Sequence, residues 1–156
     1  MAQILCQRDP KWGAVMIGNS PVNIHEDGCA ITAFCQGMNT VFGKKLTPDV
    51  LAHDAALFDS IGEVNWGALC RYVGGVQFDG EENVEDDTKI LQYLKAKDKF
   101  VILRFPLPRA LTHFALCWSK PPLSGDFKIA DPWYGDIRWA RGQYHSITGA
   151  RYFSKA

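Results

Sequence analysis

The sequence contains no long run of apolar residues and no excess of charge of either sign. Its 17 Lys and Arg residues balance its 17 Asp and Glu residues, so the formal net charge is zero. A transmembrane helix needs about 20 consecutive, largely apolar residues, and no segment comes near that length. A neutral chain also lacks the cationic surplus that holds a phosphate backbone through counterion release. We therefore expect neither a membrane span nor a nucleic-acid partner.

The N-terminus lacks the pattern of a secretory signal peptide, in which a basic segment precedes an apolar core. The chain is therefore expected to be made in the cytoplasm without a targeting segment. Its five cysteines are odd in number, and none belongs to a Cys-x-x-Cys pair. This usage argues against a disulfide framework and against a structural zinc site.

What remains is the composition of an ordinary globular protein. Apolar residues make up 47% and charged residues 22% of the 156 residues, a balance that is wrong for a disordered chain. This length suits one domain, and the sequence shows no internal repeat, low-complexity tract or interdomain linker. We therefore expect a single domain over residues 1–156.

A buried helix that begins with a cysteine is predicted after the turn at Asp27-Gly28. Cys29 falls in its first turn, with Asp27 as the expected N-cap. Unpaired N–H groups and the positive end of the helix dipole surround a side chain at that place and favour a nucleophilic thiolate. We therefore predict that Cys29 is the nucleophile of a cysteine hydrolase. The helix itself is indicated by apolar residues at helical spacing, namely Ala30, Phe34, Met38 and Val41.

Helices are predicted in the first two thirds of the chain and strands in the remainder. After an irregular arm over residues 3–24 and the cysteine helix, further helices are expected over residues 47–58, 65–73 and 87–97. The acidic residues 79–87 are expected to form an exposed loop. Strands are expected over residues 100–105, 112–118, 127–130, 137–139 and 151–153. This order is typical of an α+β fold, in which helices pack on one side of an antiparallel sheet.

A cysteine nucleophile requires a base, and four histidines are candidates. His113 begins a predicted strand, where a rigid sheet would aim its ring, whereas His53 lies on the polar side of a helix. His25 is close to Cys29 in sequence, and His145 has no distinguishing context. We favour His113 as the base, with a structural core histidine as the alternative when it is considered alone.

Two further residue types complete the chemistry. Asp131 follows a predicted strand, and Pro132 holds it extended, so its carboxylate could orient an imidazole and leave the other ring nitrogen to take the thiol proton. The alternative is a turn-forming Asp-Pro pair. Gln7 offers an amide N–H of the kind that stabilises an oxyanion, although alone it is an ordinary surface glutamine.

The remaining cysteines and two tryptophans have other expected roles. Trp12 and Trp133 lie near Gln7 and Asp131 in sequence, so with Gly28 beside the nucleophile they are expected to bind substrate. For Trp133 the alternative is a cover over His113 that keeps water away. Cys35 is a weaker competitor for the nucleophile, and it is grouped with the other cysteines as a small core residue. These are Cys6, Cys35, Cys70 and Cys117.

Together these motifs resemble one family of enzymes. The chain is similar to the bacteriocin-leader peptidase-like branch, family C thirty-nine-like, of the papain-like cysteine peptidases. The resemblance spans nearly the whole chain and rests on five segments in the family's order. They are Gln7-x-Asp9-Pro10-x-Trp12, Gly28-Cys29-Ala30, Thr112-His113-Phe114, Asp131-Pro132-Trp133-x-Gly135 and Tyr144-x-x-Ile147-x-Gly149-x-Arg151-Tyr152.

The resemblance implies a papain-like fold, with the cysteine on a helical part and the histidine and aspartate on an antiparallel sheet. It implies Cys29 as nucleophile, His113 as base, Asp131 as orienting acid and Gln7 as oxyanion donor, with no metal or cofactor. Transporter-linked members of the family precede membrane and ATPase domains, and no such domain follows here. We therefore do not carry over their double-glycine leader substrate, and we expect a stand-alone bacterial or phage type.

The expected function is hydrolysis of peptide bonds in a peptide or in the peptides of peptidoglycan. Murein endopeptidase or amidase activity and transglutaminase or deamidase activity would use the same three groups. A non-catalytic peptide-binding module is the alternative from another class. A cell-wall target would be reached by release on lysis or by carriage in a phage particle, and no oligomeric state is predicted.

Overall fold

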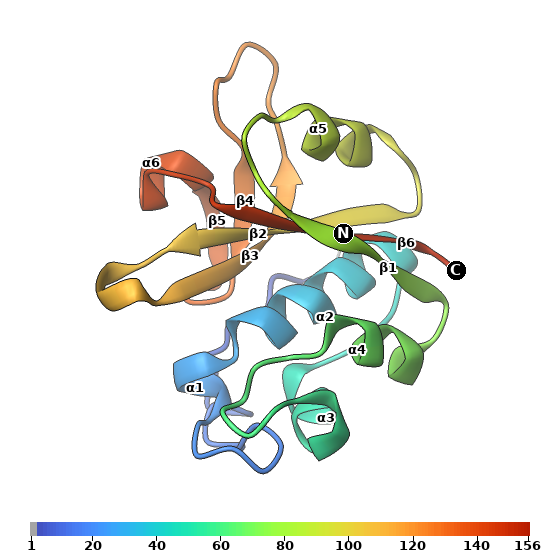
Figure 1. Ribbon diagram of the computed structural model, residues 1–156, viewed down its shortest axis with the longest axis vertical. Helices are drawn as coiled ribbons and strands as arrows, with labels where there is room; N and C mark the ends of the chain where they lie inside the picture. Colours follow the sequence, from blue (N-terminus) through green and yellow to red (C-terminus); the bar gives the residue numbers. More distant parts are fainter. Residues whose placement is uncertain (1–2) are drawn as a thin grey trace.

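A computed structural model describes residues 3–156, so the first two residues of the expected domain lie outside the described residues. The strands form one antiparallel sheet of six, in the order β1-β6-β2-β3-β4-β5. Helices α1 to α4 lie on one side of this sheet, and α5 and α6 lie on the other (Figure 1). The predicted α+β fold with an antiparallel sheet is therefore confirmed, although helices cover both of its sides.

The elements have the following bounds. The helices are α1 Ile24–Asp27, α2 Cys29–Phe42, α3 Pro48–Ala52, α4 Trp66–Val73, α5 Thr88–Lys95 and α6 Ala140–Tyr144, with 3-10 turns η1 Ala55–Leu57 and η2 Pro108–Ala110. The strands are β1 Val76–Asn83, β2 Lys99–Pro106, β3 Thr112–Ser119, β4 Lys128–Asp131, β5 Asp136–Trp139 and β6 Gly149–Lys155. Within residues 3–156, no helix is long and apolar enough to cross a membrane.

Helix α2 runs under the sheet and begins at Cys29, as the apolar spacing predicts. It lies close to β2 because Gly37 has no side chain: a Cβ there would come within 2.5 Å of the Phe100 ring. The prediction that Asp27 caps this helix is wrong. Asp27 ends the short helix α1, and Gly28 is the N-cap of α2 without a side-chain hydrogen bond. The chain takes two successive helical segments here, so the capping side chain is the earlier Asn23, which accepts from the Glu26 N–H.

The expected helix over residues 47–58 is divided into α3 and η1. Helix α3 ends at Ala52, and Asp54 begins η1 by accepting a hydrogen bond from the Ala56 N–H at 3.0 Å. An aspartate that bonds the backbone two residues later competes with helical hydrogen bonding and favours a new start.

The expectation of an exposed acidic loop over residues 79–87 is wrong for its first half. Residues 76–83 form the edge strand β1, which pairs with β6 through a bulge between Phe78 and Gly80. An edge strand has one neighbour and solvent beside it, so it tolerates acidic side chains that a central strand would not. Two of them have partners across the strand pair, since Glu81 contacts Arg151 and Glu82 accepts a hydrogen bond from the Tyr152 hydroxyl.

The sheet separates two apolar cores. On the side of α1 to α4, the core includes Phe34 and Met38 of α2, which pack with Phe100 and Phe153 of the sheet. On the other side, α5 and α6 cover a second core around Phe105. Because α2 packs directly on β2, β3 and β4, its first residue is fixed relative to the strands that carry the other expected site residues.

Candidate active site

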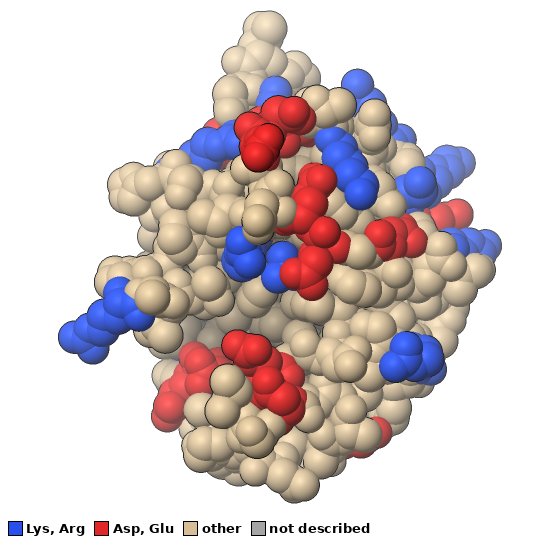
Figure 2. Space-filling model, in the orientation of Figure 1, with Lys and Arg blue, Asp and Glu red and all other residues tan. Residues whose placement is uncertain are grey.

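Cys29 stands at the mouth of a cleft between the helical part and the sheet. Its side chain is partly exposed and begins α2, so the unpaired N–H groups of the first helical turn surround it. The cleft has a volume of about 640 Å³, and its lining residues include Cys29, Trp66, Phe114 and Arg151. Figure 2 shows a hollow on this face of the molecule, between the sheet above and the helical part below. A nucleophile at this place has room beside it for a substrate.

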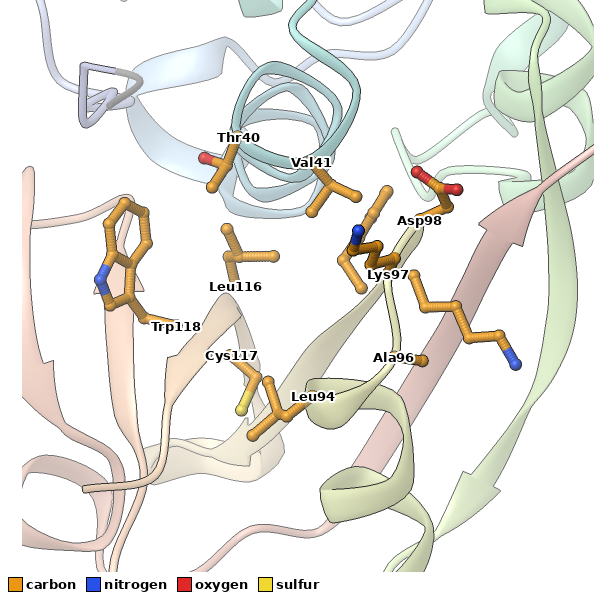
Figure 3. A pocket seen from close by; sticks show the side chains of 11 residues that line it. Thr40, Val41, Leu94, Ala96, Lys97, Asp98, Leu116, Cys117 and Trp118 are labelled. Atoms are coloured by element: carbon orange, nitrogen blue, oxygen red, sulfur yellow. The ribbon is translucent and has the colours of Figure 1, made fainter. Parts of the chain in front are cut away.

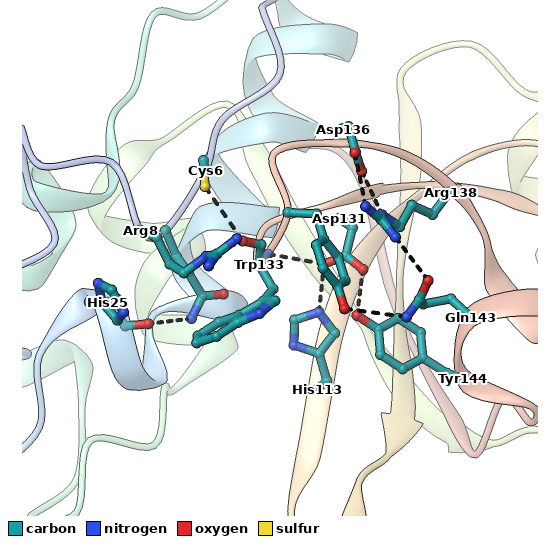
Figure 4. Close-up of polar contacts among 12 residues, drawn as sticks. Cys6, Arg8, His25, His113, Asp131, Trp133, Asp136, Arg138, Gln143 and Tyr144 are labelled. Carbon is teal, nitrogen blue, oxygen red and sulfur yellow. Dashed lines mark hydrogen bonds and ion pairs between the residues drawn. The ribbon is translucent and has the colours of Figure 1, made fainter.

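His113 and Asp131 meet at one end of neighbouring strands. His113 lies near the start of β3 and Asp131 ends β4. Because these strands are antiparallel neighbours, the two positions lie at the same end of the strand pair. The His113 Nε2 is 2.9 Å from the Asp131 Oδ1, and both side chains are buried (Figure 4). The Nδ1 atom of the ring is therefore left for another partner, as a base for a thiol requires.

Asp131 is fully buried and accepts three hydrogen bonds. The Trp133 backbone N–H donates to Oδ1 at 3.0 Å, and the Tyr144 hydroxyl donates to Oδ2. Burial alone would raise the pKa of Asp131, but the hydrogen bonds from His113, Tyr144 and the Trp133 backbone hold it below its usual value. The carboxylate is therefore charged, and it stabilises a protonated His113.

Tyr144 is the site residue that sequence reasoning missed. It lies at the end of α6, a helix that the sequence patterns do not predict, and its ring stacks on Phe105 at 4.7 Å and lies beside His113 at 5.1 Å. Burial and the Asp131 carboxylate raise the pKa of Tyr144 above its usual value, so it stays a proton donor. The family resemblance includes Tyr144 in its final segment, which is the available signal, but it assigns the residue no role.

The electrostatics of His113 depend on both neighbours. Burial alone would lower its pKa, whereas the hydrogen bond to Asp131 and the adjacent Cys29 side chain raise it to about 9. Cys29 thus lies close enough to act on the imidazole, whose Nε2 is bound to Asp131.

This raised pKa predicts a pH dependence of stability. The His113 pKa is about 9 in the folded protein and 6.5 for a free histidine, so the folded state binds the proton more tightly. The resulting stabilisation is fully present below about pH 6.5 and is lost as the pH rises through about 9. Urea unfolding of the wild type and of His113→Gln, from about pH 6 to pH 10, should show a difference that shrinks with pH. A difference that stays constant would contradict the assigned pKa.

Gln7 is anchored between Pro132 and α1 by both its backbone and its amide. Its backbone N–H donates to the Pro132 carbonyl at 2.8 Å, and its Nε2 donates to the His25 carbonyl of α1 at 3.0 Å. The side chain is 1% exposed, and its Oε1 has no hydrogen-bond partner. Because a carbonyl can only accept, the amide nitrogen must face His25, and one of its two N–H groups remains for an oxyanion.

Two of the residues expected to bind substrate have structural positions instead. Trp12 is 7% exposed and belongs to the core on the helical side, with its Nε1 donating to the Cys6 carbonyl at 2.8 Å. Its ring is thus used for packing and forms no wall of the cleft. Gly28 is buried, and a Cβ there would lie 2.5 Å from the Ile24 carbonyl oxygen. A side chain is excluded at Gly28 by this close approach of α1, which explains the glycine without a substrate.

Trp133 braces the turn that follows β4. Its backbone carbonyl accepts from the Arg8 Nε at 2.7 Å, the Arg8 guanidinium lies 4.6 Å from the indole, and the ring meets His25 edge-on at 5.8 Å (Figure 4). Trp133 does not line the cleft that contains Cys29, and its ring lies against Arg8 and His25 instead. The other nearby carboxylate, Asp136, pairs with Arg138 at the surface.

Within the described range of residues 3–156, the other cysteines and histidines do not form a second site of this kind. A cavity of about 410 Å³ near the end of α2 is lined by Cys117, with Thr40, Leu94 and Trp118 around it (Figure 3). Burial raises the pKa of the Cys117 thiol, as it does for Cys35 and Cys70, so all three remain protonated. The histidines at positions 25, 53 and 145 are exposed. Among residues 3–156, no group of three or more His, Cys, Asp or Glu residues is placed to hold a metal ion.

No protein-family model matches this chain, and no curated protein gives a significant match. The function must therefore be inferred from the site itself. Its members are a cysteine at a helix N-terminus, a buried histidine–carboxylate pair and an adjacent cleft.

Proposed function

We propose that the protein is a papain-like cysteine hydrolase that cleaves peptide bonds, of the kind resembling the bacteriocin-leader peptidase-like family. One observation carries the proposal: Cys29, at the start of α2, lies near the His113 ring, and the Nε2 of that ring is bound to the buried Asp131. A nucleophile, a base and an orienting group in this order are the elements of covalent acyl transfer.

The proposed reaction begins with attack of the Cys29 sulfur on a carbonyl carbon. The thiol proton passes to His113 Nδ1, and the Cys29 backbone N–H and the free Gln7 N–H stabilise the oxyanion. His113 then gives its proton to the leaving amine as the C–N bond breaks, which leaves a thioester on Cys29. Water, deprotonated by His113, hydrolyses the thioester and restores the thiol.

Asp131 and Tyr144 act behind the histidine in this mechanism. The carboxylate holds the Nε2 proton and stabilises the imidazolium that forms during attack. Tyr144 and the Trp133 backbone N–H keep the carboxylate aimed at His113 and satisfy its remaining oxygen. Because His113 and Asp131 are buried, water does not screen their charges as it would at the surface.

Substrate panels distinguish this function from its alternatives. Purified peptidoglycan, a denatured protein and glycine-containing peptides should be offered to the wild type and to Cys29→Ala, with Cys6→Ser as a matched control at another partly exposed thiol. New amino termini from any substrate, absent in Cys29→Ala and present in Cys6→Ser, would support hydrolysis and identify peptide or murein cleavage. Cys29-dependent ammonia release without new termini would indicate a deamidase. Tight peptide binding by wild type and Cys29→Ala without turnover would indicate a binding module.

A further inference from the structure

Two arginines line the sheet wall of the cleft beside Cys29. Arg151 lies on β6, directly across from Glu81 on β1 and from Ile102 on β2. Arg104 lies two residues beyond Ile102, so it belongs to the same face of the sheet. Arg104, Arg151 and Glu81 all line the cleft that contains Cys29. The sheet register thus places two guanidinium groups and one carboxylate on the surface that a substrate would contact.

The charges on this wall are not balanced. Among the described residues, Arg104 bonds only neutral groups, with the Thr148 Oγ1 at 3.2 Å, the Thr148 carbonyl at 3.1 Å and the Asn83 Oδ1 at 3.2 Å. Arg151 pairs with the Glu81 Oε2 at 3.1 Å. In the part of the chain that the structure describes, this wall therefore carries two guanidinium groups and one carboxylate, and the carboxylate pairs with Arg151.

Arg151 is a costly residue to keep at this position. It is 7% exposed, and its Nε is buried without a hydrogen-bond partner. Burial lowers its pKa, Glu81 raises it, and the repulsion from Arg104 lowers it further. A buried cation with an unpartnered donor is destabilising unless something compensates it. A strand that needed only packing against Phe114 would be served better by an apolar side chain.

The helical wall of the cleft, which faces the two arginines, carries negative charge. Asp27 from α1 and Glu63 from the loop before α4 line the helical side. Figure 2 shows basic and acidic side chains above the hollow and acidic side chains below it. A ligand with a negative group would therefore be oriented with that group toward β2 and β6, away from the helical wall.

We propose that the substrate carries a carboxylate, and that Arg104 and Arg151 bind it next to the bond that Cys29 attacks. This inference rests on the proposed function, because it names the substrate class of the same site. Planar guanidinium groups match a carboxylate with two parallel hydrogen bonds. The carboxylate belongs either to an acidic side chain or to a free chain end, since both present the same chemistry to the two arginines.

Matched electrophiles test the proposal without knowledge of the natural substrate. Each probe alkylates a thiol as sulfur displaces chloride, and each is made as an acid and as its isosteric amide. Chloroacetyl-Gly-Glu-amide is paired with chloroacetyl-Gly-Gln-amide, and chloroacetyl-Gly-Gly with its terminal amide. Acetyl-Glu-Gly chloromethyl ketone and its Gln counterpart extend in the other chain direction. The second-order rate of Cys29 modification is measured by intact mass, with peptide mapping.

The wild type is expected to react about tenfold faster with the acid than with the amide in at least one pair, as one charge-assisted interaction supplies. Which pair responds distinguishes a side-chain carboxylate from a terminal one. Arg104→Gln should abolish this preference, and Arg104→Lys should restore part of it. Glu81→Gln should increase the preference, because it removes the competing carboxylate from Arg151. Lys45→Gln makes the same charge change on an exposed loop and should leave the preference unaltered.

The outcomes separate the two proposals. Rapid labelling of Cys29 at equal rates by every acid and amide would overturn the carboxylate site and leave the cysteine hydrolase standing. Failure of all probes to label Cys29 would overturn the proposed function itself. An acid preference that persists in Arg104→Gln would also overturn the assignment. The substitutions are made at Arg104 because Arg151 is buried. The test therefore does not depend on whether a variant at Arg151 folds.

Discussion

Replacing Cys29 by alanine is expected to abolish hydrolysis, by about 10⁶-fold in kcat, as removal of the nucleophile from a catalytic triad does. The fold should persist, because the Cys29 side chain is partly exposed and Ala is a good helix former at the start of α2. Stability should change by less than about 0.5 kcal/mol. Circular dichroism and urea unfolding check the fold, and release of amino termini checks the activity.

The same residue should be the most reactive thiol in the native protein. Limiting iodoacetamide at neutral pH, followed by peptide mapping, is expected to modify Cys29 before the buried Cys35, Cys70 and Cys117. His113→Ala should slow this labelling, because the thiolate loses its neighbouring imidazolium. Preferential labelling of Cys6, or a rate that is unaffected by His113→Ala, would show that Cys29 is not activated by the pair.

Asp131→Asn is expected to lower turnover by up to about 10⁴-fold while the protein remains folded. All three groups that bond Asp131 are donors, from His113, Trp133 and Tyr144. An asparagine amide offers these donors one acceptor oxygen, and its own N–H₂ group faces the donor that the second carboxylate oxygen now accepts. The imidazole then loses the group that fixes its tautomer and the negative charge that stabilises its protonated form. The unpaired donor should cost about 1–3 kcal/mol of stability. Steady-state kinetics and urea unfolding measure the two effects.

Two variants make the comparison specific. Asp136→Asn removes a surface carboxylate that pairs only with Arg138 and should leave turnover unchanged. Tyr144→Phe keeps the carboxylate and removes one of its donors, so its loss of turnover should be smaller than that of Asp131→Asn. A silent Asp131→Asn beside a damaging Asp136→Asn would show that Asp131 is not the orienting acid. Loss of folding in Asp131→Asn would favour a structural Asp-Pro turn.

Much of the architecture could be predicted because it depends on local pattern. The spacing of Phe34 and Met38 indicated α2, and short apolar segments between turn residues indicated β2 to β5. The position of Cys29 in the first helical turn followed from the same spacing. His113 and Asp131 could be named because each lies at the end of a predicted strand. Their actual meeting depends on the pairing of β3 with β4.

The features that escaped prediction depend on contacts between distant segments. β1 is rich in acidic residues, and only its pairing with β6 makes it a strand. Gly28 replaced Asp27 as the cap because α1, a helix of four residues, is too short to give a periodic pattern. Trp12 was expected at the substrate because it is near Gln7 in sequence, but its indole turns into the core. Tyr144 reaches Asp131 from a separate helix, and no sequence period records that contact.

The central place of β6 in the sheet has a consequence for how the chain folds. β6 follows every other strand in the sequence, yet it lies between β1 and β2 and joins them. Until it has been made, β1 has no strand partner, and β2 presents an open edge to other chains. Helix α2, which begins with Cys29, is thus synthesised well before the sheet that carries His113 can be completed. Such non-local pairing slows folding, and a partly made chain therefore holds Cys29 before the sheet that carries His113 and Asp131 is complete.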